Sequence, residues 1–243
     1  MLVAEFSMES KGGHAASPPP HTPIGILSRA VTRIEANPFK IQLTPPVAAM
    51  FDILGRRSSF VYRLIFANLW CFMPVLDSVC RKSGGQLNAM LRTTCAFTMM
   101  EGSNASNVLP PSAKMTANLR LIGGETVDSA MKYLESVTDD PDVKLSAVYG
   151  MSPSAVSPAD GSGWENLMGA VMQTWPGAIV SPYLMFACSD SRHYCRISEH
   201  VYRFSAAKLS TEGFAMIHGH NERISLDALT RIVQFYMRLM AKC

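Results

Sequence analysis

The stretch Lys114-Met115-Thr116-Ala117-Asn118-Leu119-Arg120-Leu121-Ile122 alternates apolar and polar side chains, and Gly123-Gly124 follows it directly. A period of two predicts a half-buried strand with its apolar side chains on one face. After the glycines, apolar residues recur at helical spacing, with an acidic residue in the first turn (Val127, Ala130, Met131, Leu134 and Val137; Asp128). The segment is therefore a strand, a turn and an amphipathic helix.

Similar patterns lie on both sides of this unit. Strands are expected at residues 1–10, 92–100 and 143–150, and a helix at residues 24–34, where Pro38 disfavours its continuation. With the intervening residues set aside, the order is β-α-β-β-α-β, a common arrangement of strands and helices. The predicted fold class is α+β (mixed α/β).

Residues 39–92 form a Met-rich and aromatic-rich insertion, which we expect to be helical and broken by prolines and by Gly84-Gly85. Within it, residues 60–76 are membrane-like in composition but are interrupted by Arg63, Asn68 and Pro74. The apolar runs between these breaks are too short to cross a bilayer. We interpret them as buried or capping helices. The lesser alternatives are a membrane-associated surface and a cover over a substrate entrance that favours hydrophobic acyl groups.

A Ser-, Pro- and Gly-rich stretch, residues 151–163, predicts a domain boundary. The expected domains are residues 1–152 and 153–243. In the second we expect strands at 182–187 and 201–205 and helices at 164–174 and 225–240, the last capped by Ser225. These strands are too few for a complete sheet, so this part is predicted to be the end of a larger domain that exposes apolar surface.

The composition excludes some classes of protein. The 243 residues carry a net charge of +3 without a dense basic stripe, which argues against a nucleic-acid partner. Six scattered cysteines without a C-x-x-C pair favour free thiols in a reducing compartment, and no secretion signal is recognised at the N-terminus. We therefore expect a cytoplasmic protein with no nucleic-acid and no membrane partner.

A histidine lies in a glycine-containing turn, His218-Gly219-His220, just before the last predicted helix. Neutral imidazole is the commonest protein ligand for metals, but a zinc site needs three or four ligands. The turn therefore suggests one ligand of a metal site and leaves the others to be found.

Six motifs in a fixed order carry a resemblance to a known family. The chain resembles the zinc-dependent amidohydrolases and metallopeptidases that include acetylornithine deacetylase, aminoacylase, carboxypeptidase G and yeast carboxypeptidase S, and especially the carboxypeptidase S-like branch. The resemblance covers almost the whole chain, and its motifs are GGHAASPP (12–19), NVLP (107–110), NLRL (118–121) before GET (124–126), SDSRHY (189–194), VYRF (201–204) and HGHNER (218–223).

The resemblance implies a lid domain, which commonly dimerises, followed by the C-terminal segment of an α/β zinc-hydrolase catalytic domain. The complete family enzyme holds two zinc ions. Its His-x-Asp metal motif has no match here. Its paired glutamates have none either, because the adjacent acidic pair Asp139-Asp140 ends a lid helix. The chain is thus expected to supply at most one recognised zinc ligand and to be inactive alone.

Individual roles follow from the resemblance. His218 matches the metal ligand, and His14 matches the lid histidine that stabilises the oxyanion, often across the dimer. Four positions match residues that contact the substrate or line its pocket (Asn107, Arg120, Ser189 and Arg192). Arginine suits a carboxylate because its planar donors bind both oxygens. The complete enzyme is expected to hydrolyse an amide bond next to a free carboxylate, in a small peptide or an N-acyl amino acid.

Simpler interpretations stay open. His14 would otherwise be a solvated loop histidine, Asn107 could cap a turn, and Arg120 could form an ordinary surface pair. Cys188 and Cys195 flank a candidate site but are expected to be inert buried thiols. The alternative to a partial zinc carboxypeptidase or amidohydrolase is a non-catalytic dimerisation or binding module derived from that family. Either one is expected to form a homodimer through the lid.

Overall fold

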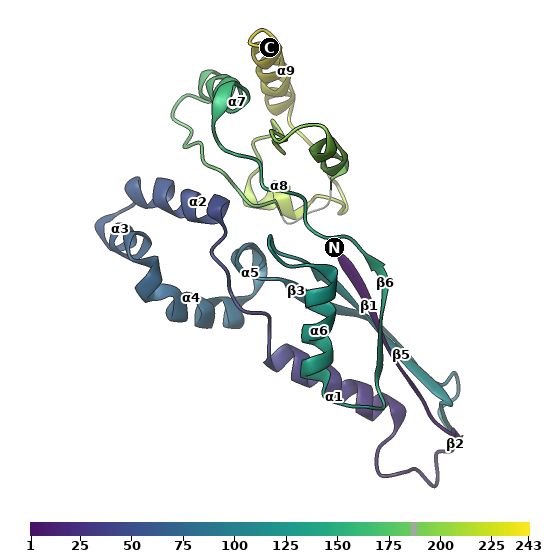
Figure 1. Ribbon diagram of the computed structural model, residues 1–243. Coiled ribbons are helices and arrows are strands. Elements are labelled where there is room, and N and C mark those ends of the chain that lie inside the picture. Colours follow the sequence, from purple (N-terminus) through teal and green to yellow (C-terminus); the bar gives the residue numbers. More distant parts are fainter. Residues whose placement is uncertain (186–188) are drawn as a thin grey trace. The chain divides into compact units, whose positions relative to one another are not determined.

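A computed structural model of the chain describes residues 1–185 and 189–243, which form two compact units (Figure 1). Unit 1 comprises Met1–Ser154 together with residues 184–185, and unit 2 comprises Ala155–Tyr183 and Ser189–Cys243. The break after Ser154 lies in the stretch that is rich in Ser, Pro and Gly.

A four-stranded antiparallel sheet forms the centre of unit 1. Its strands are β1 (Leu2–Glu9), β3 (Thr94–Glu101), β5 (Ser112–Arg120) and β6 (Lys144–Gly150), in the spatial order β3-β5-β1-β6. The four strands are those predicted from the sequence, within two residues at most ends. A two-residue ribbon, β2 (Gly13–His14) paired with β4 (Val108–Leu109), was not predicted.

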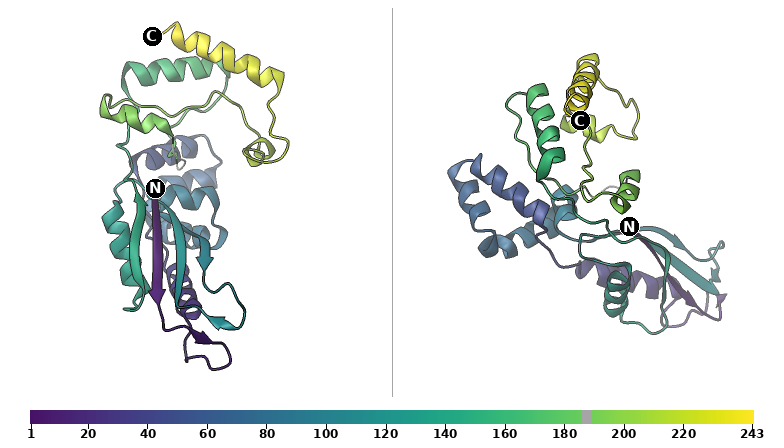
Figure 2. Two further views of the ribbon diagram at one scale, coloured as in Figure 1. Left: turned by 90° about the vertical axis from the view of Figure 1, so that its right-hand side faces the viewer. Right: turned by 45° about the horizontal axis from the view of Figure 1, so that its top comes forward.

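Helices α1 (Pro23–Ala36) and α6 (Val127–Thr138) lie side by side on one face of this sheet (Figures 1 and 2). The alternation in β1 and β5 sends their apolar side chains to that face, where they are fully buried with the inner faces of the helices (Leu2, Ala4, Phe6, Met115, Ala117, Leu119, Leu27 and Leu134). On the other face, Lys114 lies 3.2 Å from Glu5 across the strand pair. The predicted β-α-β-β-α-β unit and the mixed α/β class are confirmed.

Local chemistry fixes where these two helices begin. Thr22 caps α1 by accepting a hydrogen bond from the Gly25 N–H, and Pro23 occupies the first helical position. In α6, Thr126 and Ser129 cap each other's backbone N–H groups, which satisfies two donors that the helix itself leaves unpaired.

The predicted helical insertion is confirmed as four helices, α2 (Pro45–Arg56), α3 (Phe60–Ala67), α4 (Leu69–Ser83) and α5 (Gly85–Leu91). They enclose a separate small core (Val47, Met50, Phe51, Cys80, Met90 and Leu91). Gly55 of α2 permits the close approach of α3, because a Cβ atom there would lie 2.8 Å from the Cβ of Phe66. Phe66 stacks on Phe51 at a ring distance of 5.2 Å.

In the described residues, no single helix is long and apolar enough to cross a membrane. The pair α3 and α4 reaches the necessary length and apolar composition only when both helices are counted together. It is bent by 103° at the break between them.

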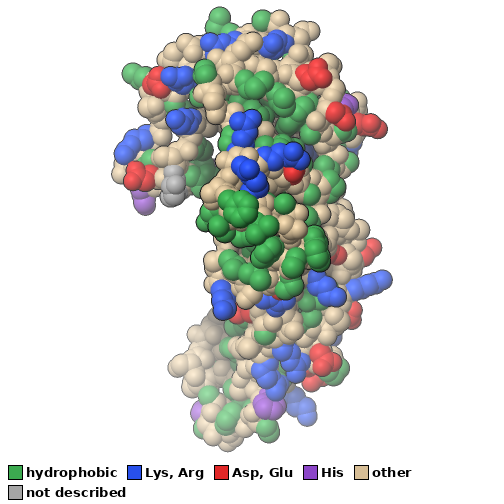
Figure 3. Space-filling view, turned by 90° about the vertical axis from the view of Figure 1, so that its left-hand side faces the viewer, with side chains coloured by type: hydrophobic (Ala, Val, Ile, Leu, Met, Phe, Trp, Pro, Cys, Tyr) green, Lys and Arg blue, Asp and Glu red, His purple; other side chains and the backbone are tan. Residues whose placement is uncertain are grey.

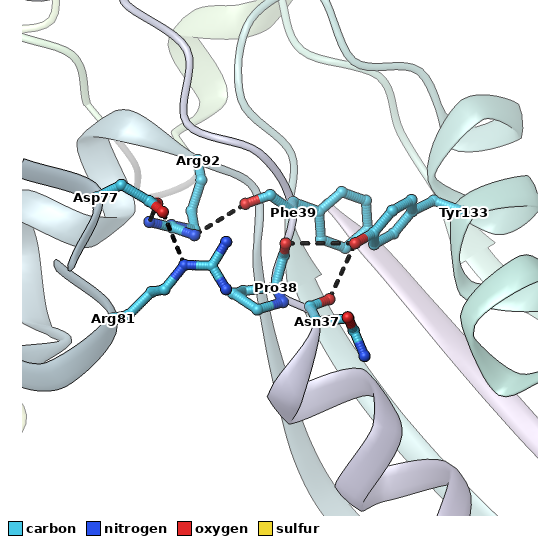
Figure 4. Close-up of polar contacts among 7 residues, drawn as sticks. All are labelled: Asn37, Pro38, Phe39, Asp77, Arg81, Arg92 and Tyr133. Carbon is cyan, nitrogen blue, oxygen red and sulfur yellow. Dashed lines mark hydrogen bonds and ion pairs between the residues drawn. The ribbon is translucent and has the colours of Figure 1, made fainter. Parts of the chain in front are cut away.

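A buried arginine joins the insertion to the sheet (Figure 4). Arg92 is 1% exposed; its guanidinium donates to the Phe39 carbonyl at 3.0 Å and forms an ion pair with Asp77 of α4. Arg81 also binds Asp77, at 2.8 Å. Burial acts to raise the pKa of Asp77, but the hydrogen bonds and charges of Arg81 and Arg92 outweigh it, so this pKa is lowered.

Unit 2 contains α7 (Gly161–Thr174), a 3-10 helix η1 (Asp190–Arg196), α8 (Thr211–Ala215) and α9 (Leu226–Met240). Its core is small (Ala170, Val171, Ala206 and Phe235), and α9 is tied to α7 where Arg238 donates to the Thr174 hydroxyl at 2.8 Å. The predicted cap is confirmed, because the Ser225 hydroxyl accepts from the Ala228 N–H at 3.1 Å. Large apolar side chains stay exposed in this unit, as expected (among them Ile197, Leu226, Met237 and Met240).

Two sequence predictions for unit 2 are wrong. Residues 201–205 form no strand, because Val201 bonds through its N–H and its carbonyl to the Ser157 side chain, at 2.9 and 3.1 Å, and not to a neighbouring strand. The other predicted strand, 182–187, is irregular over its described part, 182–185, and residues 186 and 187 lie outside the described residues. The sequence analysis also missed α8, which is only five residues long.

Substitution of Asp77 by Asn is expected to lower the free energy of unfolding at pH 7 by about 2 kcal/mol, because Arg92 then stays buried without its counter-charge. A carboxylate with a lowered folded-state pKa contributes stability above its unfolded pKa of about 3.9. That contribution disappears as pH falls through the lowered value. Urea unfolding between pH 3 and 7 should therefore show a difference between the variant and the original chain that is constant above about pH 5 and shrinks below about pH 4.

Asp52→Asn is the matched control, because Asp52 forms an exposed i,i+4 pair with Arg56 on the same insertion. This control should change stability little at any pH. Equal effects of the two substitutions at pH 7, or an Asp77→Asn effect that is undiminished at pH 3, would contradict the role given to Asp77.

Candidate functional site

The β2–β4 ribbon brings two of the predicted site residues together. His14 pairs with Val108, and the Ala15 N–H donates to the Asn107 carbonyl at 2.9 Å, so Asn107, in the turn just before β4, lies beside the end of β2. Gly12 and Gly13 lead into the ribbon with φ values of +64° and +143°, which residues other than glycine rarely adopt. The glycines before His14 are therefore needed for the path of the chain, and the ribbon holds the histidine.

The imidazole of His14 is exposed, and one of its nitrogens is already engaged. The Ala16 N–H donates to Nδ1 of His14 at 3.1 Å. In the neutral ring, an acceptor at Nδ1 leaves the proton on Nε2. His14 thus presents a hydrogen-bond donor to solvent, which is the polarity that stabilisation of an oxyanion requires.

An open hollow of about 470 Å³ lies beside this ribbon. It is lined by Met8, Leu109, Pro23 at the start of α1, and residues of the loop that joins β1 to α1 (Ser10, Lys11, Gly12, Ser17, Pro18, Pro19 and His21). His14 and Asn107 are not among the residues that line it. The hollow therefore does not by itself unite the candidate residues.

Arg120 lies at the other end of the sheet. It is the last residue of β5 and pairs with Thr94 of β3, whereas β5 begins at Ser112, close to the ribbon. At about 3.3 Å per residue, the strand separates Arg120 from Ser112 by about 26 Å. Within unit 1, Arg120 is therefore not brought together with His14 and Asn107.

The other three candidates belong to unit 2. Ser189 precedes η1, and its hydroxyl accepts from the Ser191 N–H at 3.3 Å, so that this side chain caps the short helix. Arg192 lies within η1 with Nε 3.4 Å from Nε2 of the adjacent His193. The motif at residues 189–194 thus consists of a capping serine and the first turns of a 3-10 helix.

His218 lies in a tight turn with a left-handed backbone, φ +61°, which is uncommon for a residue other than glycine. Its N–H donates to the Glu222 carboxylate at 3.1 Å, and the residue is exposed. Within residues 1–185 and 189–243, no group of three His, Cys, Asp or Glu side chains is arranged to hold a metal ion. The donors present therefore do not fit a zinc site.

The cysteines vary in their environment. Cys71 and Cys243 are exposed, Cys80 is buried in the core of the insertion, and Cys95 packs against the core of the sheet. Burial, with the charge of Glu35 adding to it, raises the pKa of the Cys95 thiol to about 12. Cys195 is half-buried with its sulfur 3.5 Å from Arg203, and the expectation for Cys188 lies outside the described residues.

Thiol reactivity tests this picture of the cysteines. At pH 8 we expect Ellman's reagent to modify Cys71 and Cys243 rapidly, because they are exposed, and to modify Cys80 and Cys95 only after unfolding. Single Cys→Ser variants assign each phase of the reaction. Rapid reaction of Cys95 in the folded chain would show that its thiol is not shielded.

The sequence analysis did not single out Arg92 or Asp77. The one available signal was the i,i+4 spacing of Asp77 and Arg81 on a predicted helix, which favours an ion pair. The same spacing is typical of solvent-exposed faces, so it could not identify the buried partner, Arg92.

The family comparison is specific for most of unit 1. Residues 2–145 match the peptidase dimerisation domain family. An N-fatty-acyl-amino acid synthase/hydrolase, PM20D1, from Xenopus tropicalis is 37% identical over 98% of this chain and 47% of its own length. A probable carboxypeptidase S-like protein 2 from Dictyostelium discoideum is 32% identical over 97% of this chain and 45% of its own length. The chain thus spans about half the length of the curated relatives it matches.

Solved structures show the same fold at low identity. A metallo-carboxypeptidase of the M20 family, Sso-CP2 from Sulfolobus solfataricus, matches with a TM-score of 0.59 at 11% identity, over 98% of this chain and 57% of that one. The di-peptidase Dug1p from Saccharomyces cerevisiae matches with the same TM-score and identity, over 99% of this chain and 53% of that one.

Proposed function

The chain belongs to the peptidase dimerisation domain family, and we propose from this that it supplies the lid and part of the catalytic domain of a zinc-dependent hydrolase. The complete enzyme would cleave an amide bond next to a free carboxylate. The names of the relatives support this reaction, because one is an N-fatty-acyl-amino acid synthase/hydrolase and another a carboxypeptidase S-like protein. The substrate class is therefore a peptide or an N-acyl amino acid.

The β2–β4 ribbon is the observation that carries the proposal. It holds His14 beside Asn107 at the end of the sheet, with Nδ1 of His14 engaged by the Ala16 N–H and Nε2 left as a donor. A donor held in this way can stabilise the oxyanion that forms when an amide carbonyl is attacked. Because His14 is exposed, it is accessible to the carbonyl of a substrate held by another domain or by the partner of a dimer.

The catalytic part of the proposal is limited by the metal ligands. His218 is the one candidate zinc ligand, and the described residues around it offer no further set of donors. Zinc would therefore require ligands from the half of the family enzymes that this chain does not span. We accordingly propose that the 243 residues do not catalyse the reaction alone.

Homodimerisation is the second part of the proposal, and the family name supports it. In unit 1, β6 is an edge strand that exposes Val148 and Tyr149, with exposed fractions of 64% and 43%. An exposed edge strand offers unpaired backbone groups to a second copy. A dimer through this edge would use the sheet that carries the His14 ribbon, so each lid could serve its partner's active site.

The alternative is a dimerisation or binding module without catalysis. The incomplete metal ligands in the described residues favour it, whereas the exposed donor of His14 has no evident use in such a module. The free thiols of the five described cysteines support a reducing, cytoplasmic environment, whether the chain is part of a hydrolase or a non-catalytic module.

Replacement of His14 by Ala tests the catalytic role in a complete enzyme that contains residues 1–243. The expected result is a fall in kcat of about 10²–10³-fold with little change in KM, because a donor to the transition state is lost. His21→Ala is the matched control, since it removes another exposed histidine seven positions along the same part of unit 1, and it should leave kcat unchanged.

A mixing experiment decides whether His14 acts across a dimer. The His14→Ala enzyme is combined with a His218→Ala enzyme, and mixed dimers are allowed to form. If His14 serves the partner's site, one of the two sites in each mixed dimer is complete, and activity returns well above that of either variant. Absence of recovery, with mixed dimers shown by mass, would place His14 in its own subunit's site.

A further inference from the structure

Helices α3 and α4 present apolar side chains to solvent. Only one of the eight residues of α3 is charged, yet the helix buries none of its side chains fully. Phe60 and Trp70 are 76% and 81% exposed. Further apolar residues of both helices are between 49% and 62% exposed (Val61, Tyr62, Leu64, Val75 and Val79). Scattered exposed apolar residues are ordinary, but seven of them on one pair of short helices indicate an interaction surface.

Basic residues accompany this apolar surface. The insertion, residues 39–92, contains seven Lys and Arg residues and two Asp residues, a net charge of +5, whereas the rest of the chain carries −2. Both Asp77 and Asp52 are paired with arginines, and Arg57, Arg63 and Lys82 are exposed. Figure 3 shows hydrophobic side chains gathered beside Lys and Arg side chains on the face toward which α3 and α4 lie.

The lengths of α3 and α4 suit binding to a lipid surface better than crossing a bilayer. At 1.5 Å per residue, α3 is about 12 Å long and α4 about 22 Å, both short of the roughly 30 Å of a bilayer core. The bend of 103° keeps them from adding their lengths along one axis. Trp and Tyr are the residues favoured at the boundary between lipid headgroups and hydrocarbon, and Trp70 and Tyr62 are both exposed here.

We propose that α3 and α4 dock on the surface of an anionic lipid membrane. The exposed aromatic and aliphatic side chains enter the boundary of the hydrocarbon, and the basic residues bind the headgroups. The concentration of positive charge in the insertion selects this occupant over a second copy of the same basic surface, which like charges would repel. The proposal departs from the sequence-based expectation of no membrane partner, because the sequence pattern could not show which apolar residues stay exposed.

Sedimentation with vesicles tests the proposal on the 243-residue chain. Vesicles of phosphatidylcholine alone are compared with vesicles that contain about 30% phosphatidylserine, each at low and at high salt. We expect binding to the anionic vesicles that weakens at high salt, and little binding to the neutral ones. The Phe60→Ser/Trp70→Ser variant should bind at least about tenfold more weakly, because both side chains leave the apolar surface.

Two matched controls separate this surface from general stickiness. Ile197→Ser/Leu226→Ser removes two apolar side chains of unit 2 that are each 82% exposed, and it should leave vesicle binding unchanged. Arg63→Gln/Lys82→Gln should weaken anionic binding by about fivefold per residue, whereas Lys132→Gln/Lys208→Gln, in exposed positions elsewhere, should not.

Three results would overturn the proposal. The first is no binding to either kind of vesicle, and the second is equal binding to neutral and anionic vesicles. The third is a loss of vesicle binding in Ile197→Ser/Leu226→Ser that equals the loss in Phe60→Ser/Trp70→Ser. If the chain ignores vesicles but its mass in solution falls in Phe60→Ser/Trp70→Ser, the surface is an interface between copies. The variant's circular dichroism verifies that it is folded, and the exposure of both replaced side chains favours that outcome.

Discussion

The guanidinium group of Arg92 is buried where the helical insertion returns to the sheet, and its charge has to be neutralised there. Asp77 neutralises it from the middle of α4, and the carbonyl of Phe39 accepts from it at the point where the chain enters the insertion. Nearby, the Tyr133 hydroxyl of α6 donates to the Asn37 carbonyl at 3.0 Å (Figure 4). The entry and the exit of a 54-residue insertion are thereby fixed beside the helices that cover the sheet.

This arrangement leaves the sheet free to carry a site at its end. Because β1 and β5 bury one face only, the strands can extend into the β2–β4 ribbon without burying His14. The insertion is anchored by its inner side, so its outer side chains remain available for another partner. The same division into a packed side and an exposed side thus underlies both the proposed oxyanion donor and the proposed lipid surface.

The sequence predicted the elements of unit 1 well because they are strongly periodic. The alternation at residues 114–122 and the helical spacing of apolar residues from Val127 to Val137 are local features that tertiary contacts reinforce. Prediction failed at residues 201–205, where the side chain of Ser157 replaces a strand partner, and at Arg92, whose burial depends on residues 15 and 53 positions away. Of the candidate site, the pairing of His14 with Asn107 needed the ribbon, which two-residue strands do not reveal in a sequence.

Zinc bound per chain tests the central claim most directly, namely that these residues carry the lid and an incomplete set of metal ligands. The chain is equilibrated with limiting zinc, loose metal is removed, and bound zinc is determined by elemental analysis, with His218→Ala alongside. The account predicts essentially no zinc in either protein. One or more tightly held zinc ions per chain, lost in His218→Ala, would show that a metal site is complete within these residues and would contradict the account.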